Sequence, residues 1–345
     1  MFSPKYIITD PLLANIKRIN NLINELNDRR FPNIVLLELE KTAREVSTFA
    51  STSIEGNPLP LTEVKKILKS KPVHIRESER EVLNYNQAFQ YLNKILNKRQ
   101  AKLSLALILK IQKQVTDGLL PKFESGRLRQ QPVVVNNPRT RQVKFLPPDA
   151  KDVESLIFDL IGFVNTGRKE IDALILAGLF HKQLVLIHPF MDGNGRTTRL
   201  ATKVLLSEMG LDTFNLFSFE NYYNRNVTKY FENVGEIGNY YDLVSYGIDF
   251  TPWLEYFTEG IIDELLRVQK LLPKVGISPK SELLSYHLNV LDFISRKGFI
   301  TDKDYAKLTN RAKATRTIDF QKLIELGLIE RKGKGRATYY LLKEK

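Results

Sequence analysis

Apolar residues recur at helical spacing through most of the chain. Within residues 11–29 they stand three and four positions apart, so one face of a helix would collect them. Similar spacing continues over residues 34–51, 62–68, 77–97, 103–119, 150–166, 171–187 and 200–208. Two or three further helices are expected within residues 219–272. The pattern therefore predicts a mainly α-helical protein.

One segment departs from this period. Residues 131–135 and 142–146 are short runs rich in Val and other apolar residues, and a turn-forming Asn-Asn-Pro-Arg stretch follows the first run. Such a pattern predicts a small β-hairpin over residues 131–146. Pro147 and Pro148 follow at once and end it.

A separate unit is predicted near the C-terminal end. Pro and Gly residues within 273–280 are typical of a linker. Beyond it, helices are predicted at 283–297, 302–309 and 311–326, followed by strands at 328–331 and 337–342. This order resembles a winged helix-turn-helix, with the third helix as recognition helix and the basic turn between the strands as the wing.

Composition narrows the class of protein. The 345 residues are 43% hydrophobic and 26% charged, which is ordinary for a globular protein of two or three domains. No run of about 18 consecutive apolar residues occurs, so no membrane span is expected. The N-terminus lacks the apolar core of a secretory signal. The absence of cysteine excludes disulfides and thiolate metal sites, and it fits a cytoplasmic protein.

The chain is basic, with a formal net charge of +13. Residues 281–345 hold 14 Lys or Arg against 8 Asp or Glu, which makes DNA a candidate partner. The side chains expected to contact phosphates lie on the recognition helix and the wing: Arg311, Lys313, Arg316, Lys332, Lys334 and Arg336. A module of the same fold that docks a protein or forms a homodimer explains the pattern equally well.

The strongest chemical signal lies in residues 188–199, HPFMDGNGRTTR. A Gly-Asn-Gly turn opens a helix there, and backbone N–H groups in such a turn suit phosphate oxygens. Arg196 and Arg199 are three positions apart and add guanidinium groups on the same side. Asp192 is a hard oxygen ligand suited to Mg²⁺, and His188 is suited to deprotonate a hydroxyl. Each feature alone has a structural explanation, but together they predict a phosphate-handling site.

This segment matches the motif HxFx(D/E)GNGRxxR at every defined position, so the chain resembles the Fic family. The resemblance implies a helical Fic core that transfers AMP from ATP, with Mg²⁺, to a Tyr, Thr or Ser hydroxyl of an unidentified target protein. It makes His188 the base and Asp192 the Mg²⁺ ligand. The nucleotide-binding residues that it implies within the motif are Gly193, Asn194, Gly195, Arg196, Thr197, Thr198 and Arg199.

A second part of the resemblance lies nearer the N-terminus. Ser51, Glu55 and Gly56 fit the pattern (S/T)xxxE(G/N), which Fic proteins use for self-inhibition. Its position resembles the class in which the inhibitory helix precedes the Fic domain. By this resemblance Glu55 pairs with Arg199 in the place of the γ-phosphate, so that bound ATP is misaligned. An ordinary helix C-terminus explains the same residues.

The resemblance also assigns the surroundings of the motif. The predicted hairpin is similar to the Fic flap, which pairs with the target backbone as an added strand, here through Val133, Val134 and Val135. Tyr230 and Tyr240 are expected to line the adenine site, although aromatic residues at such spacing are commonly core residues.

The resulting organisation has four parts. Residues 1–110 form a helical region with the inhibitory helix at about 40–56, residues 111–272 form the Fic core, 273–280 the linker and 281–345 the winged helix. We expect an autoinhibited protein adenylyltransferase. Two alternatives stay open: removal of AMP at the same site, with Glu55 positioning a water, and a DNA-binding regulator whose Fic core senses nucleotide.

Overall fold

The computed structural model describes residues 2–29, 31, 33–97, 101–136, 142–275, 283–325, 328–333 and 335–343. Over these ranges it contains 15 α-helices, three short 3-10 helices and five short strands, so the prediction of a mainly α-helical protein is confirmed. The chain divides into two compact units: Met1–Arg29 with Lys41–Gln269, and Arg30–Glu40 with Lys270–Lys345. None of the helices in the described ranges has both the length and the apolar character needed to cross a membrane.

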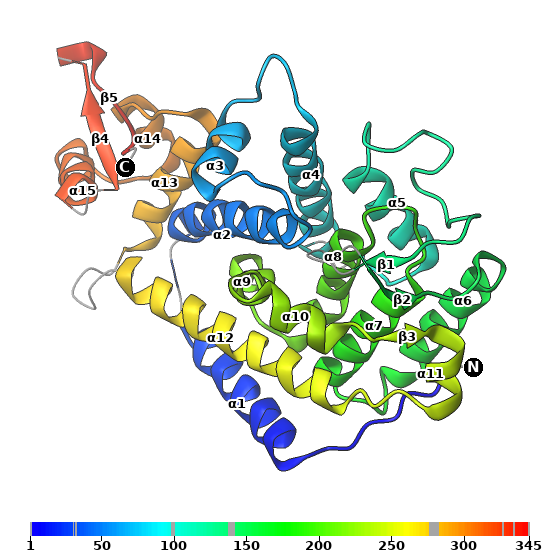
Figure 1. The fold of residues 1–345 in the computed structure, drawn as a ribbon. Helices are drawn as coiled ribbons and strands as arrows, with labels where there is room; N and C mark the ends of the chain where they lie inside the picture. The colour runs from blue at the N-terminus through cyan, green and yellow to red at the C-terminus, as the bar shows by residue number, and fades with distance from the viewer. Residues whose placement is uncertain are drawn as a thin grey trace. The chain divides into compact units, whose positions relative to one another are not determined.

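Two consecutive helices form the centre of the first unit, α7 (Ala173–Ile187) and α8 (Asn194–Leu206) (Figure 1). Nearly all their side chains are buried. This explains why apolar residues fall on all sides of α7, whereas a surface helix has one apolar face. Gly178 lets α12 (Thr251–Val275) pack closely, since a Cβ there would lie 2.7 Å from the Leu254 side chain. Trp253 on α12 donates a hydrogen bond of 2.8 Å to the Gly178 carbonyl.

The other helices that contribute to this unit surround the pair: α1 (Asp10–Asn27), α2 (Asn33–Ile54), α3 (Leu61–Lys69), α4 (Glu77–Asn97), α5 (Leu105–Val115), α6 (Ala150–Gly167), α9 (Glu220–Arg225), α10 (Val227–Val234) and α11 (Tyr240–Tyr246). Residues 219–272 therefore hold four helices, whereas two or three were predicted. The extra breaks lie at Asn226 and Asn239, whose side chains cap the N-termini of α10 and α11.

A three-stranded sheet of order β1-β2-β3 contains the predicted hairpin. β1 (Val135–Asn136) pairs antiparallel with β2 (Val143–Leu146). The first strand is shorter than predicted, because Val133 and Val134 precede it. β3 (Gly238–Asn239) pairs in parallel with β2 and was not predicted, since two residues carry no alternating pattern. Residues 137–141, which include the predicted turn, lie outside the described residues.

The second unit contains α13 (Ser285–Lys297), α14 (Asp302–Leu308), α15 (Lys313–Glu325), β4 (Ile329–Lys332) and β5 (Tyr339–Leu342). β4 and β5 pair antiparallel, and Ile300 forms a further bridge with Tyr340. A core that includes Val290, Tyr305 and Phe320 holds the helices against this hairpin. The elements follow the predicted order. Within the predicted linker, α12 continues to its end at Val275, and residues 276–280 lie outside the described part of the chain.

Candidate active site

The predicted base lies at the end of α7. His188 is the C-cap of that helix and has left-handed backbone angles, φ 51° and ψ 59°; no other non-glycine residue in the described ranges has a positive φ. Its Nδ1 lies 3.2 Å from the Val185 carbonyl oxygen. Because a carbonyl only accepts, Nδ1 donates and Nε2 is left to accept a proton. Burial lowers the pKa of His188 below its ordinary value of 6.5, so the imidazole is neutral near pH 7, as a general base requires.

Arg129 holds the loop that follows His188, although it lies outside the motif. Its side chain is only 2% exposed. The guanidinium donates to the carbonyls of His188 at 2.8 Å, Gln131 at 3.1 Å and Pro148. Its backbone N–H donates to the Pro189 carbonyl at 2.9 Å. Arg129 thus connects the loop after His188 with both ends of the predicted flap segment, at Gln131 and Pro148. Arg129 was not predicted as a site residue, because no local pattern distinguishes it from the other arginines.

In the Gly-Asn-Gly turn, the backbone conformation and the hydrogen bonds explain which residue stands at each of the first two positions. Gly193 has φ 79°, a conformation that favours glycine, and a Cβ there would lie 2.9 Å from the Thr116 side chain. Asn194 closes the loop: its Oδ1 accepts from the Phe190 N–H at 2.9 Å and its Nδ2 donates to the Phe190 carbonyl at 2.8 Å. Phe190 itself is fully buried and anchors the loop in the core.

The predicted inhibitory segment contacts the motif at Arg199. This side chain is completely buried; its Nε donates to Ser51 Oγ at 2.8 Å, and its Nη2 donates to the Ser51 carbonyl at 2.9 Å and to Glu55 Oε1 at 2.7 Å. A Cβ at Gly195 would lie 2.2 Å from Glu55 Oε1, so the carboxylate rests directly on the first turn of α8. Gly56, with φ 96°, lets the chain turn away after Glu55. The structure therefore brings together residues that are 144 positions apart.

Arg196 faces a different set of partners. Its Nη1 donates to Glu81 at 3.0 Å and its Nη2 donates to Asp192 Oδ2 at 2.8 Å. The buried hydroxyls of Thr197 and Thr198 have no hydrogen-bond partner in the described structure. Neither threonine is among the residues that line the cavity beside the motif. The geometry therefore connects Arg199, but not these two threonines, with that cavity.

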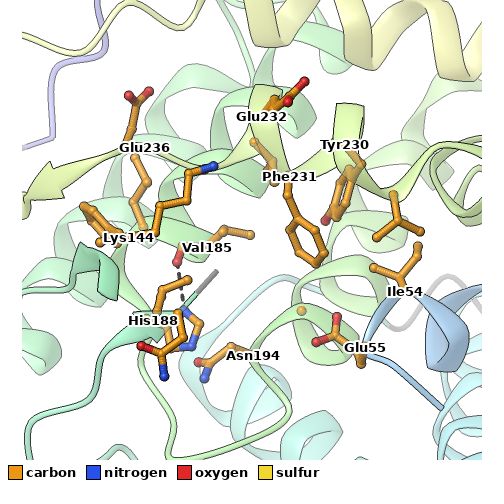
Figure 2. Close-up of a pocket in the computed structure, with 18 of the residues that line it drawn as sticks. Ile54, Glu55, Lys144, Val185, His188, Asn194, Tyr230, Phe231, Glu232 and Glu236 are labelled. Carbon is orange, nitrogen blue, oxygen red and sulfur yellow. Dashed lines mark hydrogen bonds between the residues drawn. The ribbon is translucent and has the colours of Figure 1, made fainter. Parts of the chain in front are cut away.

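This cavity has a volume of about 640 Å³, within the range of small-molecule sites. It lies between the end of α2, the flap strands, the start of α8 and α10. Figure 2 shows His188 and Asn194 along one wall, Glu55 beside them and the Phe231 ring pointing in from α10. The predicted base and the predicted inhibitory carboxylate thus share one cavity.

The two tyrosines predicted at the adenine site are separated. Tyr230 contributes to the cavity wall, and its hydroxyl lies 3.0 Å from Nε2 of the buried His181. Tyr240 does not line the cavity. Its hydroxyl accepts from Gln183 at 3.0 Å, and its ring packs in a small core with Phe145. Of the two tyrosines, Tyr230 therefore lies at the cavity and Tyr240 does not.

Asp192 fits as a protein ligand of a magnesium ion. No group of three His, Cys, Asp or Glu side chains in the described ranges could hold a metal by itself. The Asp192 side chain is 48% exposed, and its Oδ2 accepts a hydrogen bond from Arg196. Mg²⁺ is commonly held by one or two carboxylates, with substrate phosphates and water completing its octahedron. His181 instead is a neutral core residue, because burial holds its pKa well below the ordinary value.

Comparisons with known proteins agree with this geometry. Residues 102–206 match the family model described as Fic/DOC family. The chain is 30% identical over 213 residues to "Protein adenylyltransferase fic-1" of Caenorhabditis elegans, which covers 59% of this chain and 40% of that protein. It is 29% identical over 217 residues to "Protein adenylyltransferase Fic" of Aedes aegypti, covering 57% and 42%. The chain thus spans about two fifths of the length of these curated relatives.

Solved structures show the same fold. A Fic family protein from Desulfovibrio desulfuricans superposes with a TM-score of 0.67 at 20% identity, covering 100% of this chain and 99% of that chain. Fic-1 from C. elegans gives a TM-score of 0.59 at 22% identity, covering 77% and 74%. The fold is therefore the helical Fic fold. The chain carries a Fic/DOC domain, and the predicted resemblance to the Fic family is confirmed.

Proposed function

We propose that this chain is an autoinhibited protein adenylyltransferase, which transfers AMP from ATP to a Tyr, Thr or Ser hydroxyl of a target protein. The observation that carries the proposal is the Glu55 carboxylate, which contacts Arg199 and rests on Gly195. A carboxylate bound by a guanidinium at a helix N-terminus occupies a site suited to a phosphate. The relatives named protein adenylyltransferases support the same activity.

His188 supplies the base for this reaction. The hydroxyl oxygen of the target forms a bond to the α-phosphorus of ATP, and the bond from that phosphorus to the oxygen bridging to the β-phosphate breaks. Pyrophosphate leaves. His188 Nε2 accepts the hydroxyl proton, since Nδ1 is committed to the Val185 carbonyl.

The start of α8 binds the phosphates. The N–H groups of its first turn and the guanidinium of Arg199 stabilise the negative charge of the β- and γ-phosphates. Asp192 would hold Mg²⁺, which when bound neutralises phosphate charge. While Glu55 occupies Arg199, the γ-phosphate lacks this partner and ATP is held out of line for attack. Displacement of Glu55 is then the step that activates transfer.

The test is self-labelling with ATP labelled at the α-phosphate. Glu55→Gly frees Arg199, so we expect at least about tenfold more label than in the wild-type protein. Glu45→Gly, the same change earlier on α2, controls for loss of helix stability and should leave labelling low. Adding His188→Ala to Glu55→Gly should abolish the label. Equal labelling of wild type and Glu55→Gly, or labelling that survives His188→Ala, would refute the proposal.

Removal of AMP at the same site is a second candidate activity. Glu55 lines the cavity and uses Oε1 for Arg199, while its Oε2 has no hydrogen-bond partner in the described structure. That oxygen is able to orient a water for attack on the phosphorus of an AMP-modified side chain. AMP release from a modified protein should then occur with the wild type and be lost in Glu55→Gly. Release that persists in this variant would exclude the role of Glu55.

For the second unit we propose a winged helix-turn-helix that binds DNA. The order α13, α14, α15, β4, β5 supports this fold. However, Arg316 is paired with Asp302 at 2.9 Å and Arg311 with Asp319 at 2.8 Å, both within the unit. Phosphate contacts would therefore depend on other basic side chains.

Two of the six predicted DNA contacts are exposed lysines, Lys313 on α15 and Lys332 at the end of β4, where Lys332 pairs with Glu330 at 3.1 Å on the surface. Lys334 and the side chain of Arg336 lie outside the described residues. The exposed face of α15 also presents Thr317 and Gln321, residue types that contact base edges. Docking of a protein or of a second copy is an alternative for this unit, and a measurement of DNA binding separates the two. A DNA-binding regulator that senses nucleotide through its Fic core is a further alternative: its regulation would survive His188→Ala, whereas an enzyme would lose transfer.

A further inference from the structure

We propose that Glu81 is a positioning residue for the Mg²⁺ site at Asp192: by sharing the charge of Arg196, it keeps the Asp192 carboxylate available to the ion. The inference rests on the proposed function, in which Asp192 holds Mg²⁺ beside ATP. Glu81 lies on α4 and belongs neither to the motif nor to the inhibitory pattern. It is not among the residues that line the cavity, so it is not placed to contact the nucleotide.

Arg196 lies between two carboxylates. Its side chain is only 3% exposed; its Nη1 donates to Glu81 Oε1 at 3.0 Å, and its Nη2 donates to Asp192 Oδ2 at 2.8 Å. Each terminal nitrogen of the guanidinium is thus engaged by a different acidic residue. Because a buried guanidinium requires a counter-charge, loss of one carboxylate leaves the other to supply it alone. Glu81 and Asp192 therefore divide one positive charge between them.

Glu81 is itself held by the segment that follows the inhibitory pattern. Its second oxygen, Oε2, accepts from Asn57 Nδ2 at 2.6 Å. Asn57 is fixed in turn, since its Nδ2 also donates to the Ser78 carbonyl at 2.9 Å and its Oδ1 accepts from the Leu59 N–H at 3.1 Å. Both oxygens of Glu81 therefore have a donor, and the carboxylate is oriented toward Arg196.

The backbone of Asp192 is held by a different residue. Gln112 on α5 is fully buried; its Nε2 donates to the Asp192 carbonyl at 3.1 Å, and its Oε1 accepts from the Gly126 N–H. These contacts do not involve Glu81, so removal of the Glu81 charge leaves them in place. The effect of Glu81 on Asp192 is therefore electrostatic and acts through Arg196.

The charges around Asp192 govern how well it binds a divalent cation. Two carboxylates and one guanidinium leave one net negative charge in this group. Without the Glu81 carboxylate the group is neutral, and Arg196 both competes for the Asp192 oxygens and repels the ion. Partners that act on a metal ligand in this way commonly change metal affinity by about tenfold or more. Glu81 thus favours the metal-bound state without contacting the ion.

ATP binding with and without Mg²⁺ tests the proposal. Calorimetry on the full-length chain with Glu55→Gly and His188→Ala, which lacks the base, gives the Kd for ATP in EDTA and in Mg²⁺. The ratio of the two measures the contribution of the ion. We expect Glu81→Gln to lower this ratio by about tenfold and to change the Kd in EDTA by less than about threefold. Asp192→Asn should abolish the Mg²⁺ dependence. Glu77→Gln, at an exposed position of α4, is the matched control and should leave the ratio unchanged.

Transfer provides a second measurement. In the Glu55→Gly background, Glu81→Gln should raise the Mg²⁺ concentration for half-maximal self-labelling by about tenfold. The rate at saturating Mg²⁺ should stay within about twofold, because Glu81 acts on the binding of the ion and not on the base. A general loss of structure would instead lower the saturating rate.

An unchanged ratio in Glu81→Gln, a Mg²⁺ dependence that survives Asp192→Asn, or a lower saturating rate with an unchanged Mg²⁺ requirement would overturn the inference. Should Glu81→Gln fail to fold, Glu81→Ser removes the same charge, admits water beside Arg196 and decides the question by the same comparisons. If no ATP binding is detected before Glu81 is changed, the proposed function fails. If ATP binds and only the Glu81 variants have no effect, this inference alone fails.

Discussion

The imidazole of His188 combines three conditions that a general base must meet. It is neutral because burial lowers its pKa, it is oriented because Nδ1 donates to Val185, and it lines the same cavity as Glu55. Its left-handed backbone, which is uncommon for a non-glycine residue, is held by the contact of Arg129 with its carbonyl. At the scale of single residues, the site is thus defined by orientation and protonation state.

The pH dependence of transfer should report this protonation state. Protonated His188 cannot accept a proton, and its pKa lies below 6.5, so at pH 6.5 more than half of the imidazole is neutral. We expect kcat/KM for ATP in the Glu55→Gly variant to retain more than half of its plateau at pH 6.5 and to fall only at lower pH. A titration from about pH 5 to pH 8 measures it, and a midpoint at or above 6.5 would contradict the proposed environment.

At the scale of elements, the flap segment and the loop between α7 and α8 are connected by one side chain. Arg129 donates to carbonyls of both, and β3 adds a further strand to β2. A target segment that pairs with the flap would therefore be held in a fixed position relative to the loop that carries His188. In the proposed function, the position of the acceptor hydroxyl would depend on this connection.

Arg129→Lys should disrupt the alignment while keeping the charge. One ammonium group cannot reproduce the planar fork that contacts three carbonyls. We expect kcat for transfer in the Glu55→Gly background to fall by about a hundredfold, with KM for ATP changed by less than about threefold. Arg127→Lys, at an exposed position on the same segment, is the control and should have no effect. An unchanged kcat would show that Arg129 does not position the loop.

At the scale of the whole molecule, positive charge is spread over both units, and the candidate active site lies within the first. The net charge is +13, but Arg311 and Arg316, which were expected to mark a DNA surface in the second unit, are paired inside it. The net charge of the second unit, counted from its sequence, is therefore larger than the positive charge that its side chains can present to DNA phosphates. Exposed lysines are the remaining candidates.

Duplex binding followed by fluorescence anisotropy tests the role of these lysines. We expect the affinity of the full-length chain to fall with rising salt, and Lys313→Ala and Lys332→Ala each to reduce the log–log slope by about one. Lys169→Ala, an exposed lysine of the first unit, should leave the slope unchanged. Absence of binding at low salt, or affinity that ignores salt, would favour a protein partner for the second unit.

Much of the fold and of the motif was predictable because it depends on residues close together in the chain. Helical period placed the major helices, and α4 spans the predicted residues 77–97. The chemistry of residues 188–199 follows from a turn and the first turns of one helix. The Glu55–Arg199 contact was also predicted, but through family resemblance, since nothing local in either segment specifies its partner.

Tertiary structure alone decided the rest, because it depends on contacts between distant segments. Arg129 is connected to His188 across 59 residues, and Glu81 to Arg196 across 115. Packing also decided that Tyr240 does not line the cavity. In the second unit, it paired two arginines with nearby aspartates. The sequence by itself determined the helical class and the reactive groups of the loop; the packing of helices determined which side chains support those groups.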